Sequence, residues 1–138
     1  MDRPVIYLAG SIHHHPTLAS ANAWRLKATS VLEGVGYKVL NPLRDKEEGK
    51  RYPVELIVES DLQDISNSDI LLVEMTYSNK PYIGTSMEIR TAYEQGKEIF
   101  LWGAANQYNP WLIYHASEWF RTLDNALDYL VRRRTRDE

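Results

Sequence analysis

The 138-residue chain contains no cysteine, which excludes disulfide frameworks, thiolate metal sites and a cysteine nucleophile. No segment approaches the ~20 apolar residues that a membrane-spanning helix needs, and the N-terminus lacks the basic region and cleavage site of a secretory signal. Charge of one sign is also scarce: 16 basic and 19 acidic residues leave a net charge of −3, which disfavours a nucleic acid polymer or a membrane as partner. We therefore expect a cytoplasmic protein that acts on a small molecule.

The residues that are present predict one folded domain over residues 1–138. Hydrophobic residues make up 43% of the chain and charged residues 25%, which is typical of a globular protein. A chain of this length forms about one domain by the usual allowance of roughly 150 residues. A separate cofactor domain is therefore not expected.

Short apolar segments alternate with segments of helical periodicity along the chain. The expected strands span residues 5–9, 37–40, 69–75, 99–102 and 117–120. The expected helices span residues 17–32, 53–66, 85–95, 109–115 and 123–133. The inward stripe of the first helix is expected to contain Leu18, Ala21, Leu26, Ala28 and Leu32. This order predicts an α/β fold, namely a doubly wound, flavodoxin- or Rossmann-like parallel sheet of four to five strands with helices on both faces.

Ligands of such sheets bind at the carboxyl ends of the strands, so the loops that follow the strands are the candidate site. The loop after the first strand has a single glycine in place of a Gly-x-Gly-x-x-Gly fingerprint, and the chain has no P-loop motif. His13, His14 and His15 are adjacent, so in an extended loop their side chains cannot converge on one metal ion. We expect neither a cofactor nor a metal.

Asp61 interrupts an apolar helical stripe. A period of 3.6 residues places it on the inward face of its helix, together with Ile57, Val58, Leu62 and Ile65. A carboxylate is costly on such a face unless something engages it. Two interpretations remain open, a functional acid or a buried aspartate that caps a loop through backbone N–H groups. Asp64 is expected to face water.

Glu88 lies in the expected first turn of the helix over 85–95, just after a loop at a strand end. Thr85-Ser86-Met87-Glu88 matches a capping box, in which the glutamate binds the backbone at the helix start. The same position suits a nucleophile, because the positive end of the helix dipole keeps a carboxylate ionised and Gly84 allows a ligand to approach the backbone. Spacing alone leaves both roles open.

Three segments together resemble one enzyme family. IYLAGSI at 6–12, VESDLQDISNSDILLVEM at 58–75 and GTSMEIRTAYEQGKEIFLW at 84–102 are similar, in this order and spacing, to the nucleoside 2-deoxyribosyltransferases and the related 2′-deoxynucleoside 5′-phosphate N-hydrolases. The resemblance covers roughly residues 4–103 and weakens afterwards.

The resemblance implies roles for individual residues. Glu88 is the implied nucleophile that attacks C1′ of deoxyribose, Asp61 the implied proton donor or positioner at the base, and Tyr7 the implied orienting residue for the nucleophile. The residues expected to bind substrate are Gly10, Ser11, His13, Tyr82, Gly84 and Ser86. Tyr82 departs from the family, since transferases have an aspartate and the hydrolases a serine six residues before the nucleophile.

The expected activity is therefore cleavage of the N-glycosidic bond of 2′-deoxyribonucleosides, through a covalent glutamyl intermediate, with transfer of deoxyribose to another base or to water. This places the enzyme in nucleotide salvage, as a homo-oligomer without cofactor. The loop over 10–16 has no arginine for a phosphate, so the nucleoside is preferred over its 5′-monophosphate. The alternatives are a 5′-monophosphate N-hydrolase and a non-catalytic nucleotide-binding module.

Overall fold

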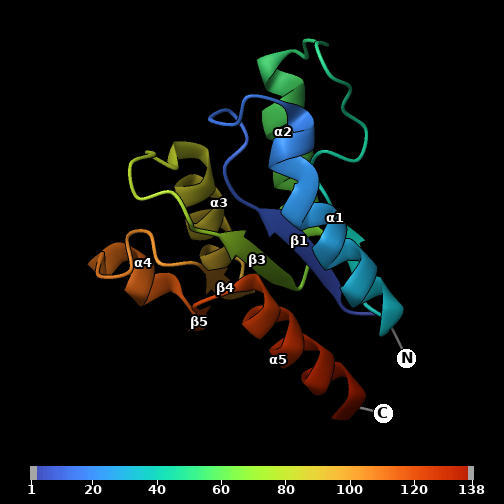
Figure 1. Ribbon diagram of the computed structural model, residues 1–138, viewed down its shortest axis with the longest axis vertical. Coiled ribbons are helices and arrows are strands. Elements are labelled where there is room, and N and C mark those ends of the chain that lie inside the picture. Colours follow the sequence, from blue (N-terminus) through green and yellow to red (C-terminus); the bar gives the residue numbers. More distant parts are fainter. Residues whose placement is uncertain (1–2, 137–138) are drawn as a thin grey trace.

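The computed structural model describes residues 3–136, which form five strands and five helices (Figure 1). In chain order, the elements are β1 (Val5–Ala9), α1 (Leu18–Gly34), β2 (Lys38–Leu40), α2 (Val54–Ser66), β3 (Ile70–Glu74), α3 (Ile83–Glu94), β4 (Glu98–Trp102), α4 (Pro110–His115), β5 (Glu118–Phe120) and α5 (Leu123–Arg136). All ten agree in type with the elements expected from sequence.

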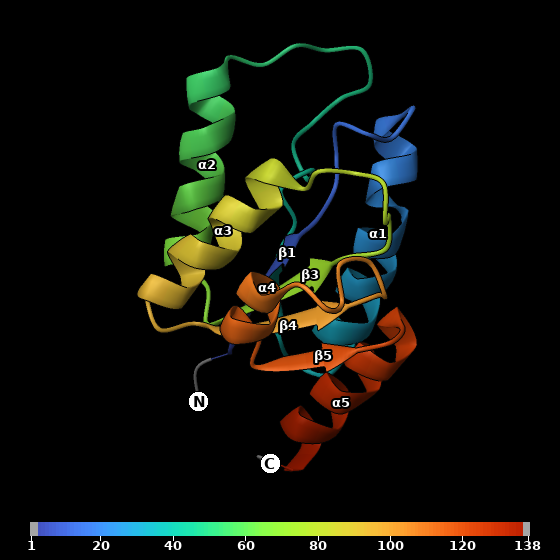
Figure 2. The same ribbon diagram turned by 90° about the vertical axis from the view of Figure 1, so that its left-hand side faces the viewer.

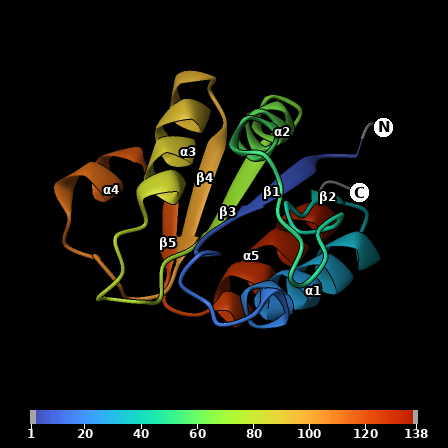
Figure 3. The same cartoon turned by 90° about the horizontal axis from the view of Figure 1, so that it is seen from above.

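The strands form one parallel sheet in the order β2-β1-β3-β4-β5. Figure 3 shows α2, α3 and α4 on one face of this sheet and α1 and α5 on the other. The prediction of a doubly wound α/β fold is confirmed. Chain order reverses on either side of β1, so the carboxyl end of β1 lies at a topological switch point, where open α/β sheets bind ligands.

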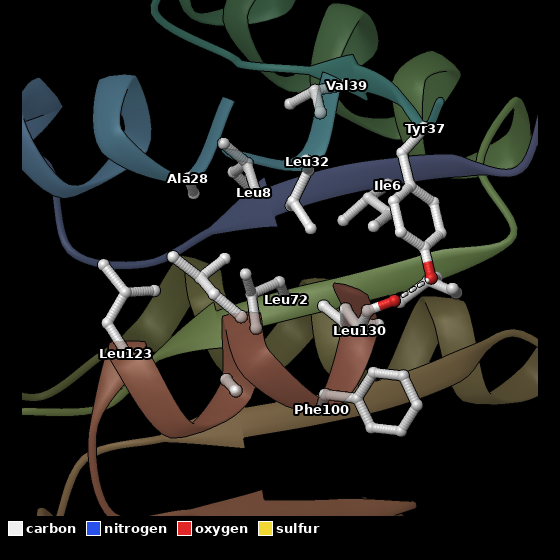
Figure 4. Close-up of a cluster of buried hydrophobic side chains, with 13 residues drawn as sticks. Ile6, Leu8, Ala28, Leu32, Tyr37, Val39, Leu72, Phe100, Leu123 and Leu130 are labelled. Carbon is white, nitrogen blue, oxygen red and sulfur yellow. Dashed lines mark hydrogen bonds between the residues drawn. The ribbon is translucent and has the colours of Figure 1, made fainter. Parts of the chain in front are cut away.

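The alternation of side chains along β1 supplies both cores. Ile6 and Leu8 point toward α1 and α5, where they join a cluster that includes Leu72 and Leu130 (Figure 4). Tyr7 and Ala9 point to the opposite face and pack with residues of β3, β4 and α3. The alternation of side chains along β1 therefore places Tyr7 on the face of the sheet that α2 and α3 cover.

The inward face of α1 differs from the prediction at one position. Leu26 is 58% exposed, whereas Arg25 is 0% exposed and shares the buried stripe with Ala21, Ala28 and Leu32. The spacing of Ala21, Arg25, Ala28 and Leu32 fits a straight helix better than a stripe through Leu26. A buried arginine thus replaces the expected leucine.

The longest connection runs from β2 to α2 over residues 41–53, and in Figure 2 it arches above the sheet at its carboxyl edge. Arg44 of this segment binds Asp64 of α2 through two hydrogen bonds of 2.7 and 3.0 Å. The expectation that Asp64 faces water is therefore wrong, since it is buried and paired.

Within residues 3–136, no helix has the length and apolar character needed to cross a membrane.

Candidate active site

Tyr7, Asp61 and Glu88 line or adjoin one cavity at the carboxyl edge of the sheet. The cavity has a volume of about 400 Å³ and is lined by residues 10–14 after β1, by the side of α2 that includes Asp61, and by residues 82–85, Met87, Glu88 and Thr91. Tyr7 lies below it in β1 and contacts Glu88 directly. We call this space the Glu88 cavity.

Glu88 is held by Tyr7 across the top of the sheet. The Tyr7 hydroxyl donates a hydrogen bond of 2.5 Å to Glu88 Oε2, while Glu88 Oε1 accepts no hydrogen bond from residues 3–136. Burial raises the pKa of Glu88 to about 7; the Tyr7 hydrogen bond opposes this rise, and Asp61 adds to it. One carboxylate oxygen is thus anchored, and the other is free to react.

The capping-box interpretation of Glu88 is wrong. The helix begins at Ile83, two residues earlier than expected, and its N-cap residue Tyr82 makes no side-chain cap. Glu88 therefore lies in the second turn, where its carboxylate binds Tyr7 instead of the backbone at the helix start.

Tyr7 keeps its proton beside Glu88 and acts as a hydrogen-bond donor. Burial is the main cause that raises its pKa, and the neighbouring carboxylates of Glu88 and Asp61 raise it further. A neutral phenol beside a carboxylate favours the charged form of that carboxylate.

Asp61 enters the cavity without a partner. Its pKa is raised to about 6, chiefly by burial and then by Asp64, while Lys46 and Arg25 oppose the rise. Because it makes no hydrogen bond and no ion pair with residues 3–136, the loop-capping interpretation is wrong. A carboxyl group with a raised pKa and no partner has the properties of a general acid.

The apolar stripe that surrounds Asp61 is less buried than expected. Of its members, Ile65 is fully buried, whereas Val58 is 49% and Leu62 is 40% exposed. Val58 and Leu62 line the mouth of the Glu88 cavity instead of the core. The face of α2 that carries Asp61 therefore lies toward the cavity.

Five of the six expected substrate-binding residues line the same cavity: Gly10, Ser11, His13, Tyr82 and Gly84. The Ser11 side chain is buried, and its hydroxyl has no hydrogen-bond partner among residues 3–136. A hydroxyl without a partner, on a residue that lines a cavity, retains a donor and an acceptor for a ligand.

Tyr82 lines the Glu88 cavity, but its hydroxyl is already engaged in hydrogen bonds within the protein. The hydroxyl donates to Glu74 Oε2 at 2.5 Å and accepts from the backbone N–H groups of Thr76 and Tyr77. Its backbone has a φ of 49°, in the left-handed region. Burial raises the pKa of Tyr82 to about 12, so the phenol keeps its proton.

Ser86 lies apart from the other expected site residues. It lines a second cavity of about 690 Å³ on the other flank of α3, together with Arg90, Trp111 and His115. Successive residues of a helix point in different directions, and a two-residue step separates Ser86 from Glu88 by more than half a turn. The structure does not bring Ser86 together with Glu88.

Two charged residues that lie near the site were not identified from the sequence. Glu74 ends the apolar strand β3 and is 2% exposed, and Arg25 is the buried cation of α1. Each had a visible signal of the kind that identified Asp61, because Glu74 closes the apolar run of residues 70–73 and Arg25 lies between Ala21 and Ala28.

A further cavity of about 420 Å³ adjoins the Glu88 cavity and shares Ile12, His13, Ile57 and Asp61 with it. The segment 42–52 supplies most of its other walls, including Lys46 and Tyr52. Asp61 therefore lies between a compartment that contains Glu88 and a second compartment of similar size.

Among residues 3–136, no group of three or more His, Asp or Glu is placed to hold a metal ion.

Comparisons with known proteins identify the family. The structure is similar to a 2-desoxiribosyltransferase from Leishmania mexicana (TM-score 0.73, 18% identity, covering 94% of this chain and 97% of that one). It is also similar to a 2-deoxyribosyltransferase from Bacillus psychrosaccharolyticus (TM-score 0.68, 24% identity, 91% of each chain). A third similar structure is a CMP N-glycosidase from Clostridium botulinum (TM-score 0.61, 19% identity, 91% of this chain and 97% of that one).

These identities show a shared fold, and a search of curated proteins finds no match. The family model described as nucleoside 2-deoxyribosyltransferase, in contrast, matches residues 6–127. That range contains the Tyr7–Glu88 pair and Asp61, so the chain belongs to the nucleoside 2-deoxyribosyltransferase family.

Proposed function

We propose that this protein cleaves the N-glycosidic bond of 2′-deoxyribonucleosides through a covalent Glu88 intermediate. The observation that carries the proposal is the pairing of Glu88 with Tyr7, which anchors one carboxylate oxygen and leaves the other open to a cavity shared with Asp61. Two carboxyl groups with raised pKa values on one cavity supply a nucleophile and an acid, as glycosyl transfer requires.

In the first step, Glu88 Oε1 attacks C1′ of the sugar. A C1′–O bond forms as the C1′–N bond breaks, and its electron pair remains on the base nitrogen. Asp61 donates a proton to the departing base, which leaves through the compartment bounded by residues 42–52. Tyr7 favours the ionised form of Glu88 and holds it in one orientation before the attack.

In the second step, the sugar ester is released from Glu88. A nitrogen of a second base attacks C1′, the C1′–O bond breaks, and Asp61, now ionised, takes the proton that the incoming base loses. Water yields free deoxyribose by the same route. Transfer exceeds hydrolysis when a base occupies the second compartment and excludes water.

The charges of the cavity favour a nucleoside over a nucleoside 5′-monophosphate. The lining of the Glu88 cavity includes two carboxyl groups and neither lysine nor arginine. A phosphate dianion needs several convergent donors, and without them its desolvation is costly. Hydroxyl groups of a free nucleoside need only single partners such as the Ser11 hydroxyl.

The test is to incubate the protein with 2′-deoxynucleosides and with their 5′-monophosphates, with and without a second free base, and to separate the products by chromatography. Base exchange on nucleosides is the expected result. Release of base from monophosphates alone would assign the protein to the N-hydrolases, and recovery of every ligand intact would leave a binding module.

The role of Glu88 is tested with a matched pair of variants on α3. Glu88→Gln is expected to abolish base exchange, whereas Glu94→Gln, an exposed glutamate of the same helix, is expected to retain it. Intact mass spectrometry of the wild-type protein with substrate is expected to detect one deoxyribosyl group bound to the chain. Normal turnover by Glu88→Gln would refute the nucleophile assignment.

We also propose that the protein is a homo-oligomer whose interface lies at the cavity mouth. Val58 and Leu62 of α2 and Met87 of α3 line that mouth and are 49%, 40% and 66% exposed. Contiguous exposed apolar side chains mark interaction surfaces, and a second subunit there would close the site to water. Sedimentation is expected to show dissociation for Leu62→Asp but not for Leu26→Asp, which changes an exposed leucine of α1; a wild-type monomer would refute this assembly.

A further inference from the structure

Two buried residues of opposite charge hold the same peptide group at the edge of the Glu88 cavity. Arg25 is 0% exposed, and its Nη2 donates to the carbonyl oxygen of Gly10 at 3.1 Å. Glu74 is 2% exposed, and its Oε1 accepts from the N–H of Ser11 at 2.9 Å. The Gly10 carbonyl and the Ser11 N–H belong to one peptide unit, so both of its polar groups are bound.

Each of the two charged side chains is itself fixed. The Arg25 guanidinium also donates to the carbonyl of Ala21 at 2.7 Å, and it stacks on the ring of Trp24. The second oxygen of Glu74, Oε2, accepts from the Thr76 N–H, the Thr76 hydroxyl and the Tyr82 hydroxyl. Within residues 3–136, neither Arg25 nor Glu74 forms a direct ion pair. The peptide group lies between them in place of one.

Stability alone does not account for this arrangement. Burying a charge is costly, and apolar residues of similar volume often replace buried charges without loss of stability. The peptide also passes close to the carboxylate, because a Cβ added at Gly10 would lie 2.9 Å from Glu74 Cβ and Oε1. The buried charges of Arg25 and Glu74, their hydrogen bonds and the close approach of Gly10 to Glu74 therefore all involve one short segment, the start of the loop after β1.

The segment so fixed carries the free hydroxyl of the cavity. Ser11 lines the Glu88 cavity, and its Oγ is buried and has no hydrogen-bond partner among residues 3–136. A hydroxyl matches the hydroxyl groups of a sugar, since both donate and accept hydrogen bonds. The Ser11 hydroxyl can bind a sugar in one defined orientation only if the backbone of Ser11 is held in place.

We propose that Arg25 and Glu74 are positioning residues, which fix the Gly10–Ser11 peptide and thereby hold the Ser11 hydroxyl toward the sugar of the bound nucleoside. The inference rests on the proposed function in that the ligand of the cavity is a nucleoside. Neither residue contacts the reacting atoms. Their effect reaches the substrate through Ser11.

The test is a double-mutant cycle with Glu74→Gln, Arg25→Met and Ser11→Ala. Glu74→Gln is expected to raise the KM of the nucleoside by about tenfold and to change kcat less, the size expected for losing one hydrogen bond that involves a charged group. In the Ser11→Ala background, the same substitution is expected to change KM by less than about twofold, because interacting residues are not additive. An equal KM factor in both backgrounds would overturn the proposal.

A matched pair of residues provides the control. Arg133 and Glu98 form an ion pair at the start of β4, remote from the cavity, and Arg133→Met and Glu98→Gln are expected to leave KM unchanged. Where Arg25→Met does not fold, Glu74→Gln and Arg25→Lys carry the cycle.

A second readout is independent of turnover. The amide of Ser11 is expected to exchange with deuterium at least about tenfold faster in Glu74→Gln than in the wild type, and at the wild-type rate in Glu98→Gln. Inactivity of the wild-type protein on all nucleosides would refute the proposed function, and unchanged exchange at Ser11 would refute the positioning role.

Discussion

Replacing Glu88 by glutamine is expected to stabilise the protein at pH 8, even though it removes the proposed nucleophile. Burial raises the pKa of Glu88 from its ordinary value of 4.5 to about 7 in the folded state. In the unfolded chain the carboxyl group has its ordinary pKa and ionises first. Folding at pH 8 must therefore bury a charge that glutamine does not carry.

The size of the effect follows from these pKa values. The difference between 4.5 and about 7 corresponds to about 3 kcal/mol, at ~1.4 kcal/mol for each pKa unit. A folded pKa that is raised gives stability that is fully present below pH 4.5 and is lost as the pH rises to about 7. The glutamine variant lacks this loss, so the gap between the two unfolding free energies widens in its favour over that range.

Urea denaturation at pH 4, 6 and 8 measures the gap directly. Glu94→Gln is the matched control, because Glu94 is exposed on the same helix and its substitution is expected to leave the pH dependence unchanged. If Glu88→Gln and the wild type keep the same difference in unfolding free energy from pH 4 to pH 8, then Glu88 does not carry a raised pKa and the reasoning fails.

Two further predictions follow from contacts within the site. Tyr7→Phe removes the hydrogen bond that lowers the pKa of Glu88, so this pKa is expected to rise above about 7. Base exchange at pH 7 is expected to fall by about tenfold or more. A pH–rate profile identical to that of the wild type would contradict this prediction. Gly10→Ala places a Cβ 2.9 Å from Glu74 and is expected to lower the free energy of unfolding, followed by thermal denaturation, by about 1–3 kcal/mol. Gly34→Ala is the control and is expected to have no such cost, because a Cβ there meets nothing within 4 Å. Equal costs for the two variants would show that the close approach at Gly10 is unimportant.

The fold was predictable from sequence because each element has a local signal. The apolar segments that form β1, β3 and β4 are short and uninterrupted, as parallel strands covered on both faces must be. Helix starts were less accurate. The helix α3 begins at Ile83, and no side-chain cap marks that start, so the capping pattern at Thr85 indicated the wrong residue.

The site was predictable only where a residue type contradicted its surroundings or matched a family. Asp61 stood out because it is a carboxylate among apolar neighbours. Partners distant in the sequence were predictable only through the family: the resemblance implied that Tyr7 orients Glu88, 81 positions away. No pattern indicated the contact of Ser11 with Glu74, which joins residues 63 positions apart. Strand order and register create these contacts, and neither is encoded in a local pattern.

The position of Arg25 links the stability of the site to its chemistry. Burial is the main cause that raises the pKa values of Asp61 and Glu88. Asp64 raises both further, and Asp61 also raises the pKa of Glu88. The Tyr7 hydrogen bond lowers the pKa of Glu88, and Lys46 lowers that of Asp61. Arg25 adds a smaller lowering effect on both from the far side of β1, and it forms no ion pair with either. Glu88 therefore has a pKa of about 7, close to neutral pH, although it is buried, which suits the proposed nucleophile. A more exposed carboxylate would ionise more readily but would admit water. The Tyr7 hydrogen bond and, after it, the buried cation Arg25 favour the ionised form of Glu88 in a site that burial shields from water.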